Sequence, residues 1–329
     1  MRQPRATAHL MITVAALTRR RPEMVDRLIR SFGEMTVPEK CTVQCLIVEN
    51  DTSPDTCELV TARNPLPNGM ELAYVLEPEP GIPFARNRAA REALETGANL
   101  LAFVDDDEIV APDWLARMVY GYRQGRAVLL GGPRRIAPYA DGELTTLERV
   151  MHANLTANFA DIEERAARTS TVNDTPKVTV FTNNWLGETT LFSGHDIWFD
   201  ETMRFTGGTD SKFCAAVKAK NLPVGWVKDA FVYETVTRDR LSFAYQHERS
   251  RDQINNLFHQ RMSKDPSAQY KMVIRLPVKA IEILVLAISV PLTRGRTLFK
   301  LAKTTGWVAG RVGAAFGRRS KLYETAKND

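Results

Sequence analysis

The stretch that decides the fold is Asn99–Glu108, NLLAFVDDDE, in which an apolar run passes directly into three aspartates and a glutamate. An apolar run of this length is typical of a buried strand. Three adjacent carboxylates repel one another, so a strand end seldom carries them without a cation. The sequence therefore predicts a divalent-metal site at the end of a strand. A solvated acidic loop is the alternative.

Strands and helices alternate on both sides of this stretch. Further apolar runs of strand length occur at 10–17, 43–48, 72–76 and 127–131. Pro22, Pro83 and Pro112 each suit the first turn of a helix that follows a strand. This alternation predicts an α/β fold of the Rossmann-like type, with a mostly parallel central sheet flanked by helices.

Polar side chains follow three of the predicted strands. They are Thr18 and Arg19, then Glu49, Asn50 and Asp51, and finally Asp105, Asp106 and Asp107. Ligands of such sheets gather at the carboxyl ends of the strands, so we expect these residues to line one crevice. Carboxylates such as Asp105 and Asp107 suit Mg²⁺ or Mn²⁺, with substrate phosphates completing the coordination.

The helix predicted after Pro83 would direct its first backbone N–H groups at the same phosphates. Arg86 belongs to this helix and can pair with phosphate oxygens through two parallel hydrogen bonds. The alternative is a solvated arginine on the surface of the helix.

Four motifs resemble, in order and spacing, the nucleotide-binding half of glycosyltransferase family 2, which has the GT-A fold. They are ITVAALTRRRP at 12–22, LIVEND at 46–51, GIPFARNRA at 81–89 and AFVDDDE at 102–108. The resemblance covers about residues 10–250. Within the family, the chain looks like bacterial exopolysaccharide glucosyltransferases of the succinoglycan type.

The resemblance implies a role for each residue at the strand ends. Thr18, Arg19 and the turn Glu49–Asp51 would hold the uracil and ribose of a UDP-sugar, although the family usually has aspartate where Glu49 stands. Asp106 would bind the ribose, and Asp107, with help from Asp105, the metal ion. Arg86 would contact the diphosphate.

In the second half, FTGGTD at 205–210 resembles the Gly-Gly-Glu-Asp motif of the family, with Thr209 in place of the glutamate. The resemblance implies that Asp210 is the catalytic base. A carboxylate there would take the proton of the acceptor hydroxyl during attack. Attack from the face opposite the nucleotide inverts the anomeric centre. A helix N-cap is the other interpretation of Asp210.

Four residues are candidates for the acceptor side. Trp185 could stack on a sugar, and Asn184 could form hydrogen bonds with the hydroxyls of that sugar. Core packing is the alternative for Trp185. Trp114 is expected in the core. Glu234 follows Tyr233, where relatives often carry a histidine before a glutamate, and a neutral phenol is a poor Mg²⁺ ligand. Arg249, in the basic stretch 238–251, could hold the pyrophosphate of a lipid carrier, or belong to a solvated helical face.

The net charge of +5 is concentrated in a C-terminal tail. Residues 292–321 contain eight lysines and arginines and no acid, so the rest of the chain has a charge of about −3. The mainly apolar run at 283–290 is shorter than a bilayer-spanning helix, which needs about 20 residues. Apolar faces beside basic flanks predict a membrane-associating helical tail at an anionic surface. A hairpin packed on the catalytic domain or on a second copy is the alternative.

The chain is expected to divide into a nucleotide-sugar half (1–135), an acceptor and catalytic-base half (136–255) and the helical basic tail (256–329). Four cysteines without CxxC spacing suggest reduced thiols. Residues 1–10 are too poor in apolar residues for a signal peptide. We therefore expect the protein at the cytoplasmic face of a bacterial inner membrane.

Together these observations predict an inverting, metal-dependent hexosyltransferase. The expected reaction moves glucose from UDP-glucose to a lipid-linked oligosaccharide during exopolysaccharide assembly. The alternatives are a metal-dependent phosphohydrolase, whose nucleophilic aspartate normally follows the first strand, and a non-catalytic module that binds nucleotide sugar or membrane. A nucleic-acid partner is not expected, because the tail lacks interleaved aromatic residues.

Overall fold

The computed structural model describes residues 8–140, 142–175, 177–204, 207–262 and 275–318. The chain forms two compact units, one of residues 1–137, 160–204 and 208–235 and one of residues 138–159, 205–207 and 236–329. Phe205 and Thr206 of the FTGGTD motif, and Arg319 and Lys321 of the basic tail, lie outside the described residues. The division at 135 and 255 stays a prediction.

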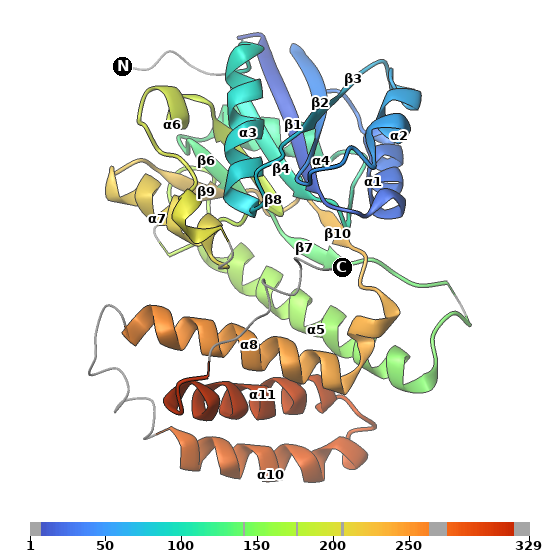
Figure 1. Ribbon diagram of the computed structural model, residues 1–329, viewed down its shortest axis with the longest axis vertical. Coiled ribbons are helices and arrows are strands. Elements are labelled where there is room, and N and C mark those ends of the chain that lie inside the picture. The colour runs from blue at the N-terminus through green and yellow to red at the C-terminus, as the bar shows by residue number, and fades with distance from the viewer. Residues whose placement is uncertain (1–7, 141, 176, 205–206, 263–274, 319–329) are drawn as a thin grey trace. The chain divides into compact units, whose positions relative to one another are not determined.

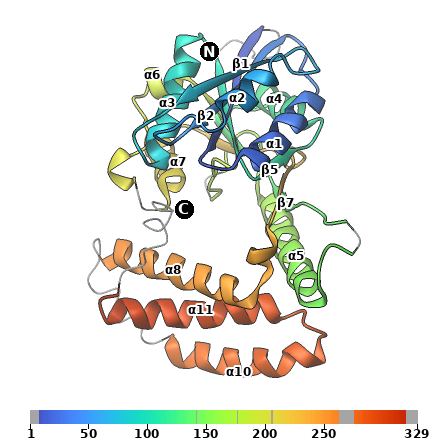
Figure 2. The ribbon, with the colours of Figure 1, turned by 45° about the vertical axis from the view of Figure 1, so that its right-hand side comes forward.

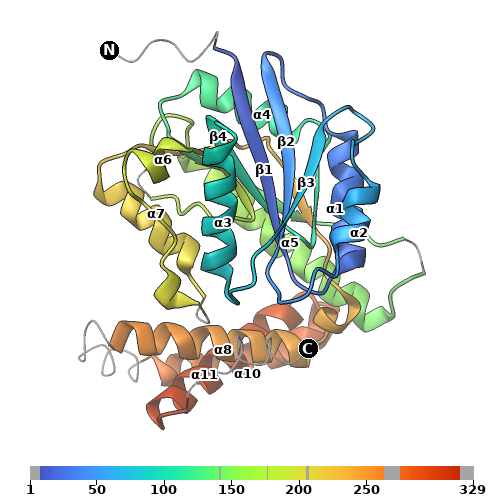
Figure 3. The ribbon, with the colours of Figure 1, turned by 45° about the horizontal axis from the view of Figure 1, so that its top comes forward.

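The first unit is built around a sheet of seven strands within the described residues, in the order β3-β2-β1-β4-β8-β6-β9. Figure 3 shows β3, β2, β1 and β4 side by side. The strands are β1 (Leu10–Thr18), β2 (Cys41–Glu49), β3 (Glu71–Leu76), β4 (Leu100–Asp105), β8 (Asn184–Glu188), β6 (Leu129–Gly131) and β9 (Val224–Trp226). Neighbours pair in parallel, except that β8 runs antiparallel to both β4 and β6. The predicted mostly parallel sheet is confirmed.

Helices cover both faces of this sheet. They are α1 (Pro22–Glu34), α2 (Cys57–Ala62), α3 (Ile82–Glu95), α4 (Trp114–Gln124), α6 (Thr190–Ser193) and α7 (Thr209–Ala219), with a 3-10 turn at Glu201–Met203. Alternate residues of β1 point to opposite faces. Ile12 and Val14 join one core with α1 and α4, while Ala15 joins a second core with α3 and α7.

The strand register brings the predicted site residues into one row. Thr18 lies opposite Glu49, and Leu17 lies opposite Asp105. Because β2 and β3 lie on one side of β1 and β4 on the other, the strand order reverses between β1 and β4. Such a reversal opens a crevice at the carboxyl ends of the strands, which is where doubly wound sheets bind ligands.

A second, three-stranded sheet extends from the acidic strand end. Its strands, in spatial order, are β5 (Glu108–Val110), β10 (Val232–Glu234) and β7 (Arg134–Ile136). β4 ends at Asp105 and β5 begins at Glu108, so the acidic run is held between a strand of the large sheet and a strand of the small one.

The second unit is helical. It contains a 3-10 turn at Arg238–Leu241 and the helices α8 (Phe243–Met262), α10 (Leu276–Leu292) and α11 (Leu298–Ala315). The first part of α5 (Thr146–Thr169) belongs to this unit and its last part to the first. α10 and α11 form a hairpin whose α11 side lies along α8 (Figures 1 and 2). The described part of the tail from residue 275 to residue 318 therefore forms a helical hairpin, and α11 is packed on α8.

Small residues let α8 and α11 approach closely. A Cβ atom added to Gly306 would lie 2.2 Å from the carbonyl oxygen of His247, and one added to Gly310 would lie 2.3 Å from that of Arg251. The hydroxyl of Ser250 also donates to the carbonyl of Lys303 across the interface.

No helix of the described residues is both long and apolar enough to cross a membrane. All four cysteines are described, and each is a free thiol.

We predict that Gly310→Ala lowers the stability of the protein by about 1–3 kcal/mol, because the new methyl group overpacks a backbone contact. Gly313→Ala, on the same helix, is the matched control: its Cβ would have no neighbour closer than 3.9 Å. That change should raise stability by up to about 1 kcal/mol, because alanine favours the helix. Thermal unfolding compares the two, and equal effects would contradict the packing described.

Candidate active site

Asp106 is the best-anchored carboxylate of the acidic run. Its Oδ2 accepts a hydrogen bond from the hydroxyl of Thr18 at 2.9 Å, and its Oδ1 accepts one from Arg21 at 3.1 Å. Burial raises the pKa of Asp106, and the Arg21 guanidinium opposes this effect. The structure therefore brings Thr18 and Asp106 into direct contact at the crevice between β1 and β4. Arg21 was not predicted as a site residue.

Asp105 and Glu108 form a buried acidic pair. Glu108 accepts a hydrogen bond from the backbone N–H of Asp105 at 2.9 Å and one from the side-chain amide of Asn183 at 3.1 Å. Burial raises the pKa of both carboxyls, and the negative charges around them raise it further. The negative charge of Asp107 is among those that raise both pKa values, and its Oδ2 lies 3.9 Å from Nη1 of Arg21. This strand end thus holds more negative charge than its surroundings easily stabilise.

Arg134 partly compensates this charge. Its guanidinium lowers the pKa of Asp105 and Glu108, and it forms an ion pair with Glu234 at 3.0 Å. Glu234 lies opposite Glu108 in the β5–β10 pair and is buried. Glu234 therefore lies beside the acidic strand end, and its assignment to the acceptor side stays a prediction.

Glu49 and Asn50, two residues of the predicted nucleotide-binding turn, form hydrogen bonds within the protein. Glu49 exposes 0% of its surface; its Oε2 accepts hydrogen bonds from the N–H and hydroxyl of Thr56 and the hydroxyl of Tyr74. Its other oxygen is buried without a hydrogen-bond partner, and nothing in the structure explains this. The prediction that Glu49 contacts the base is wrong, because the side chain has no surface to offer.

Asn50 organises the turn before α3. Its amide donates to the carbonyls of Glu77 and Glu79 at 3.0 and 2.7 Å, and its oxygen accepts from the N–H of Gly81 at 2.8 Å. Gly81 has φ = 140°, and a Cβ there would meet Arg204 at 2.9 Å, so glycine is required. Contact between Asn50 and the nucleotide stays a prediction.

Asp51 gathers the arginines that follow β1. Arg20 donates to its Oδ2 at 2.6 Å and Arg19 at 3.4 Å, and Thr52 donates its N–H to Oδ1. Burial raises the pKa of Asp51, but the Thr52 N–H and the two arginines outweigh it, so the pKa is lowered. Asp51 is therefore ionised and holds Arg19 beside the carboxyl ends of β1 and β2.

Arg86 connects the two halves of the first unit. Its side chain is 8% exposed, donates to the hydroxyls of Thr182 and Thr209, and stacks over Phe199 with its guanidinium carbon 5.3 Å from the ring centroid. Its charge also lowers the pKa of Asp105. The alternative of a solvated surface arginine is thus excluded. Arg86 joins the acidic strand end to the residue before Asp210.

Asn87 makes a second connection that the sequence did not reveal. Its amide donates to the carbonyl of Phe199 and to Glu201, and its oxygen accepts from the N–H of Phe199. The motif Arg86-Asn87 on α3 therefore holds the segment that precedes the FTGGTD motif. The signal was present in the GIPFARNRA motif, but the partners lie more than 100 residues away.

Asp210 lies in the first turn of α7. The N-cap of this helix is Gly208, whose φ is 96°, and Asp210 accepts a hydrogen bond from the N–H of Ser211 at 2.7 Å. The N-cap interpretation of Asp210 is therefore wrong. A carboxylate in the first helical turn is also favoured by the positive end of the helix dipole.

Trp185 and Asn184 belong to the core. Trp185 is 1% exposed, and the centroid of its ring lies 5.2 Å from that of Phe103 and 5.8 Å from that of Phe213. Asn184 donates to the carbonyls of Pro133 and Ala230 and accepts from the indole of Trp114. Their predicted contacts with an acceptor sugar are corrected, because β8 is a central strand. Trp114 lies in the core, as predicted.

Arg249 lies on α8 in the second unit, half-buried. Its neighbours in the basic stretch are engaged in ion pairs, Arg238 with Glu148 at 3.1 Å and Arg251 with Asp252 at 2.9 Å. The role of Arg249 toward a lipid-linked pyrophosphate stays a prediction.

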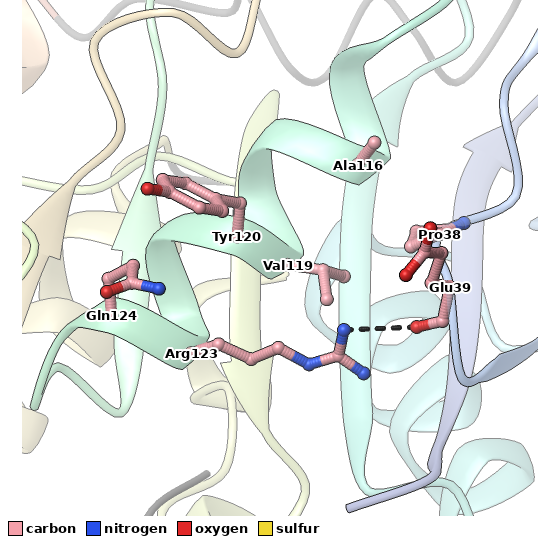
Figure 4. Close-up of a pocket in the computed structure, with 7 residues that line it drawn as sticks. All are labelled: Pro38, Glu39, Ala116, Val119, Tyr120, Arg123 and Gln124. Atoms are coloured by element: carbon pink, nitrogen blue, oxygen red, sulfur yellow. Dashed lines mark hydrogen bonds between the residues drawn. The ribbon is translucent and has the colours of Figure 1, made fainter. Parts of the chain in front are cut away.

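A shallow surface pocket occurs at the start of β2, at the amino ends of the parallel strands (Figure 4). It is lined by Pro38, Glu39, Ala116, Val119, Tyr120, Arg123 and Gln124. Arg123 donates to the backbone carbonyl of Glu39 at 3.0 Å, as the dashed line marks. The guanidinium of Arg123 thus fastens α4 to the segment just before β2.

We predict that Arg86→Met destabilises the protein by about 2–4 kcal/mol, because it leaves buried hydroxyls and the Asp105 carboxyl without their cation. Arg88→Met is the matched control on the same helix: Arg88 is partly exposed and pairs with Glu92, one turn along. Such exposed pairs contribute less than about 1 kcal/mol. Urea unfolding measures both. Comparable losses would show that Arg86 has no special place in the structure.

Comparisons with known proteins agree with this geometry. The family model for "Glycosyl transferase family 2" matches residues 13–185. The succinoglycan biosynthesis protein ExoM of Rhizobium meliloti (strain 1021) is 29% identical over 250 residues, which cover 74% of this chain and 72% of ExoM.

Two solved structures share the fold. The mannosyltransferase PcManGT of Pyrobaculum calidifontis, in complex with GDP-Man and Mn²⁺, matches 96% of this chain and 90% of its own, with a TM-score of 0.61 and 15% identity. S. aureus TarS 1-349 in complex with UDP matches 94% and 92%, with a TM-score of 0.50 and 15% identity. The chain has the GT-A fold and belongs to glycosyl transferase family 2.

Proposed function

We propose that this glycosyltransferase moves a hexose, glucose from UDP-glucose, to a lipid-linked oligosaccharide during bacterial exopolysaccharide assembly. The observation that carries the proposal is the row of strand ends where Thr18 contacts Asp106 and where Arg86 connects Asp105 with the helix of Asp210. The likeness to a succinoglycan biosynthesis protein supports the pathway, and the UDP complex of the TarS neighbour supports the donor.

The acidic strand end fits a divalent cation that shares its ligands with a substrate. No group of three or more His, Cys, Asp or Glu side chains in the described residues could hold a metal by itself. Mg²⁺ needs only one or two carboxylates when phosphates and water supply the other ligands. Asp107 and Asp105 would provide these carboxylates. The ion would neutralise the charge that develops on the departing diphosphate.

The remaining crevice residues would hold the nucleotide. Thr18 and Asp106, fixed to each other, would present oxygen atoms to the ribose, and Arg19, held by Asp51, would lie beside the base. Arg86 would act on the diphosphate through its charge and, through Thr209, on the placement of the base Asp210.

Asp210 would perform the proton transfer. Its carboxylate would accept the proton of the acceptor hydroxyl while the hydroxyl oxygen bonds the anomeric carbon and the bond to the nucleotide breaks. One displacement of this kind inverts the anomeric configuration. The acceptor is expected on a lipid carrier, and we place the reaction at the cytoplasmic face of the inner membrane.

We expect Asp210→Asn to reduce sugar transfer by about 10²–10⁴-fold, because the amide cannot take a proton. Donor binding should be unchanged, since Asp210 does not contact the nucleotide in this mechanism. Asp196→Asn, at an exposed turn, is the control and should retain full activity. Transfer is measured with radiolabelled UDP-glucose, and donor binding by calorimetry. Native transfer by Asp210→Asn would refute the assignment of the base.

Metal removal tests the acidic strand end. Treatment with EDTA should abolish donor hydrolysis, and added Mn²⁺ or Mg²⁺ should restore it, because the leaving diphosphate needs a counter-charge. Asp107→Asn should raise the metal concentration needed for half-maximal hydrolysis at least about tenfold. Glu58→Gln, on the short helix α2, is a suitable surface control. Turnover that is indifferent to EDTA would contradict the metal assignment.

The same assays separate the alternative functions. A phosphohydrolase would release phosphate from simple phosphoesters without a nucleotide sugar. A binding module would retain the donor without turnover in the presence of metal and acceptor. A panel of nucleotide sugars scored for hydrolysis identifies the donor.

A further inference from the structure

The outer face of α10 is apolar and open to solvent. Its large exposed side chains have relative exposures of 60–79%; they are Val278, Ile281, Leu284, Val285, Ile288 and Leu292. Every other exposed residue of this fully described helix is alanine or proline. A helix at a water-facing surface normally places charged and polar residues on its outer face. The outer face of α10 has the opposite character.

The polar side chains of α10 are engaged within the helical hairpin. Lys279 donates to Glu282 at 2.6 Å, and Glu282 also pairs with Lys300 of α11 at 3.6 Å. Ser289 bonds the hydroxyl of Thr297 at 2.9 Å. The helix thus turns its polar side toward its own hairpin, and this contact fixes which face remains outside.

The exposed face is too broad for a single partner helix. Its positions run from Pro277 to Leu292 and, at about 100° per residue, cover roughly half of the helix circumference. The seam of a two-stranded coiled coil is a narrower stripe of two positions in seven. A flat, continuous apolar medium covers such a face more completely than one helix of a second copy would.

Cations border the face at both ends. Arg275 precedes α10, and Arg294 and Arg296 lie in the turn that follows it; all three are exposed. Between residues 275 and 318 the chain has eight cations and a single acid, the paired Glu282. Exposed arginines beside an apolar face complement the headgroups of anionic lipids.

We propose that α10 lies in the interface of an anionic lipid bilayer, with Ile281, Leu284 and Ile288 among the acyl chains and Arg294 and Arg296 on the headgroups. α11 does not enter the bilayer, because its small residues are packed on α8. This surface is independent of the donor site, so it holds whichever sugar is transferred. A lipid-linked acceptor would be met at the same surface.

Co-sedimentation with vesicles tests the proposal on the full chain. The wild-type protein should sediment with phosphatidylcholine–phosphatidylglycerol vesicles and less with phosphatidylcholine alone. The double variant Leu284→Glu/Ile288→Glu should lose roughly tenfold or more in partitioning. Arg294→Gln should lose roughly fivefold on anionic vesicles alone. Leu147→Glu, which changes a leucine of 71% exposure on α5, is the matched control and should bind like the wild type.

Two further measurements keep the result decisive. Thermal unfolding and donor hydrolysis of the double variant should match the wild type, because both leucine and isoleucine are exposed; this separates lost membrane binding from lost folding or a wrong donor site. Undiminished vesicle binding by the double variant would overturn the proposal. So would a wild-type dimer in analytical ultracentrifugation that the double variant dissociates while neither protein binds vesicles, since a second copy would then cover α10.

Discussion

The first unit depends on one electrostatic constraint, the accumulation of four acidic side chains where β4 ends. Carboxylates in a partly buried setting repel one another and are poorly solvated, so they must be compensated. The compensating arginines come from separate parts of the chain. Arg21 precedes α1 as its N-cap residue, Arg86 lies on α3, and Arg134 begins β7. The acidic run therefore orders the elements around it as much as it marks a site.

Arg86 gives this compensation a functional consequence. The same guanidinium that stabilises the Asp105 carboxylate is held by the hydroxyls of Thr182 and Thr209. A change of charge at the strand end is thus felt by the first turn of α7, where Asp210 lies. The hydroxyls of Thr182 and Thr209 are neutral, so these two hydrogen bonds place no negative charge beside Arg86. A glutamate at position 209 would instead have placed one there.

The sequence was sufficient to predict the residues at the carboxyl ends of the parallel strands. It was not sufficient to predict the antiparallel strand β8. Thr18, Asp51, Asp105 and Asp106 were predictable because parallel strands in register bring their carboxyl ends together. Asn184 and Trp185 were misassigned because β8 joins the sheet by antiparallel pairing with strands far away in the chain. Its segment, NWLGE, has no alternation to reveal this pairing. Likewise, Glu49 looked like a ligand residue because polar groups at a strand end serve a bound nucleotide and a neighbouring loop equally well.

The helices α10 and α11 show a second limit of prediction from sequence. Its sequence indicated apolar and basic segments, but hydropathy cannot say which side of a helix meets protein. The answer comes from the hairpin, in which Glu282 and Ser289 of α10 find polar partners on one side. Since those contacts fix the rotation of the helix, the aliphatic side chains must point outward, whatever their cost in water. A helix held in this orientation gains its largest stabilisation only when a second apolar phase removes that face from water. The polar contacts within the hairpin are thus the reason that its apolar surface is available at all.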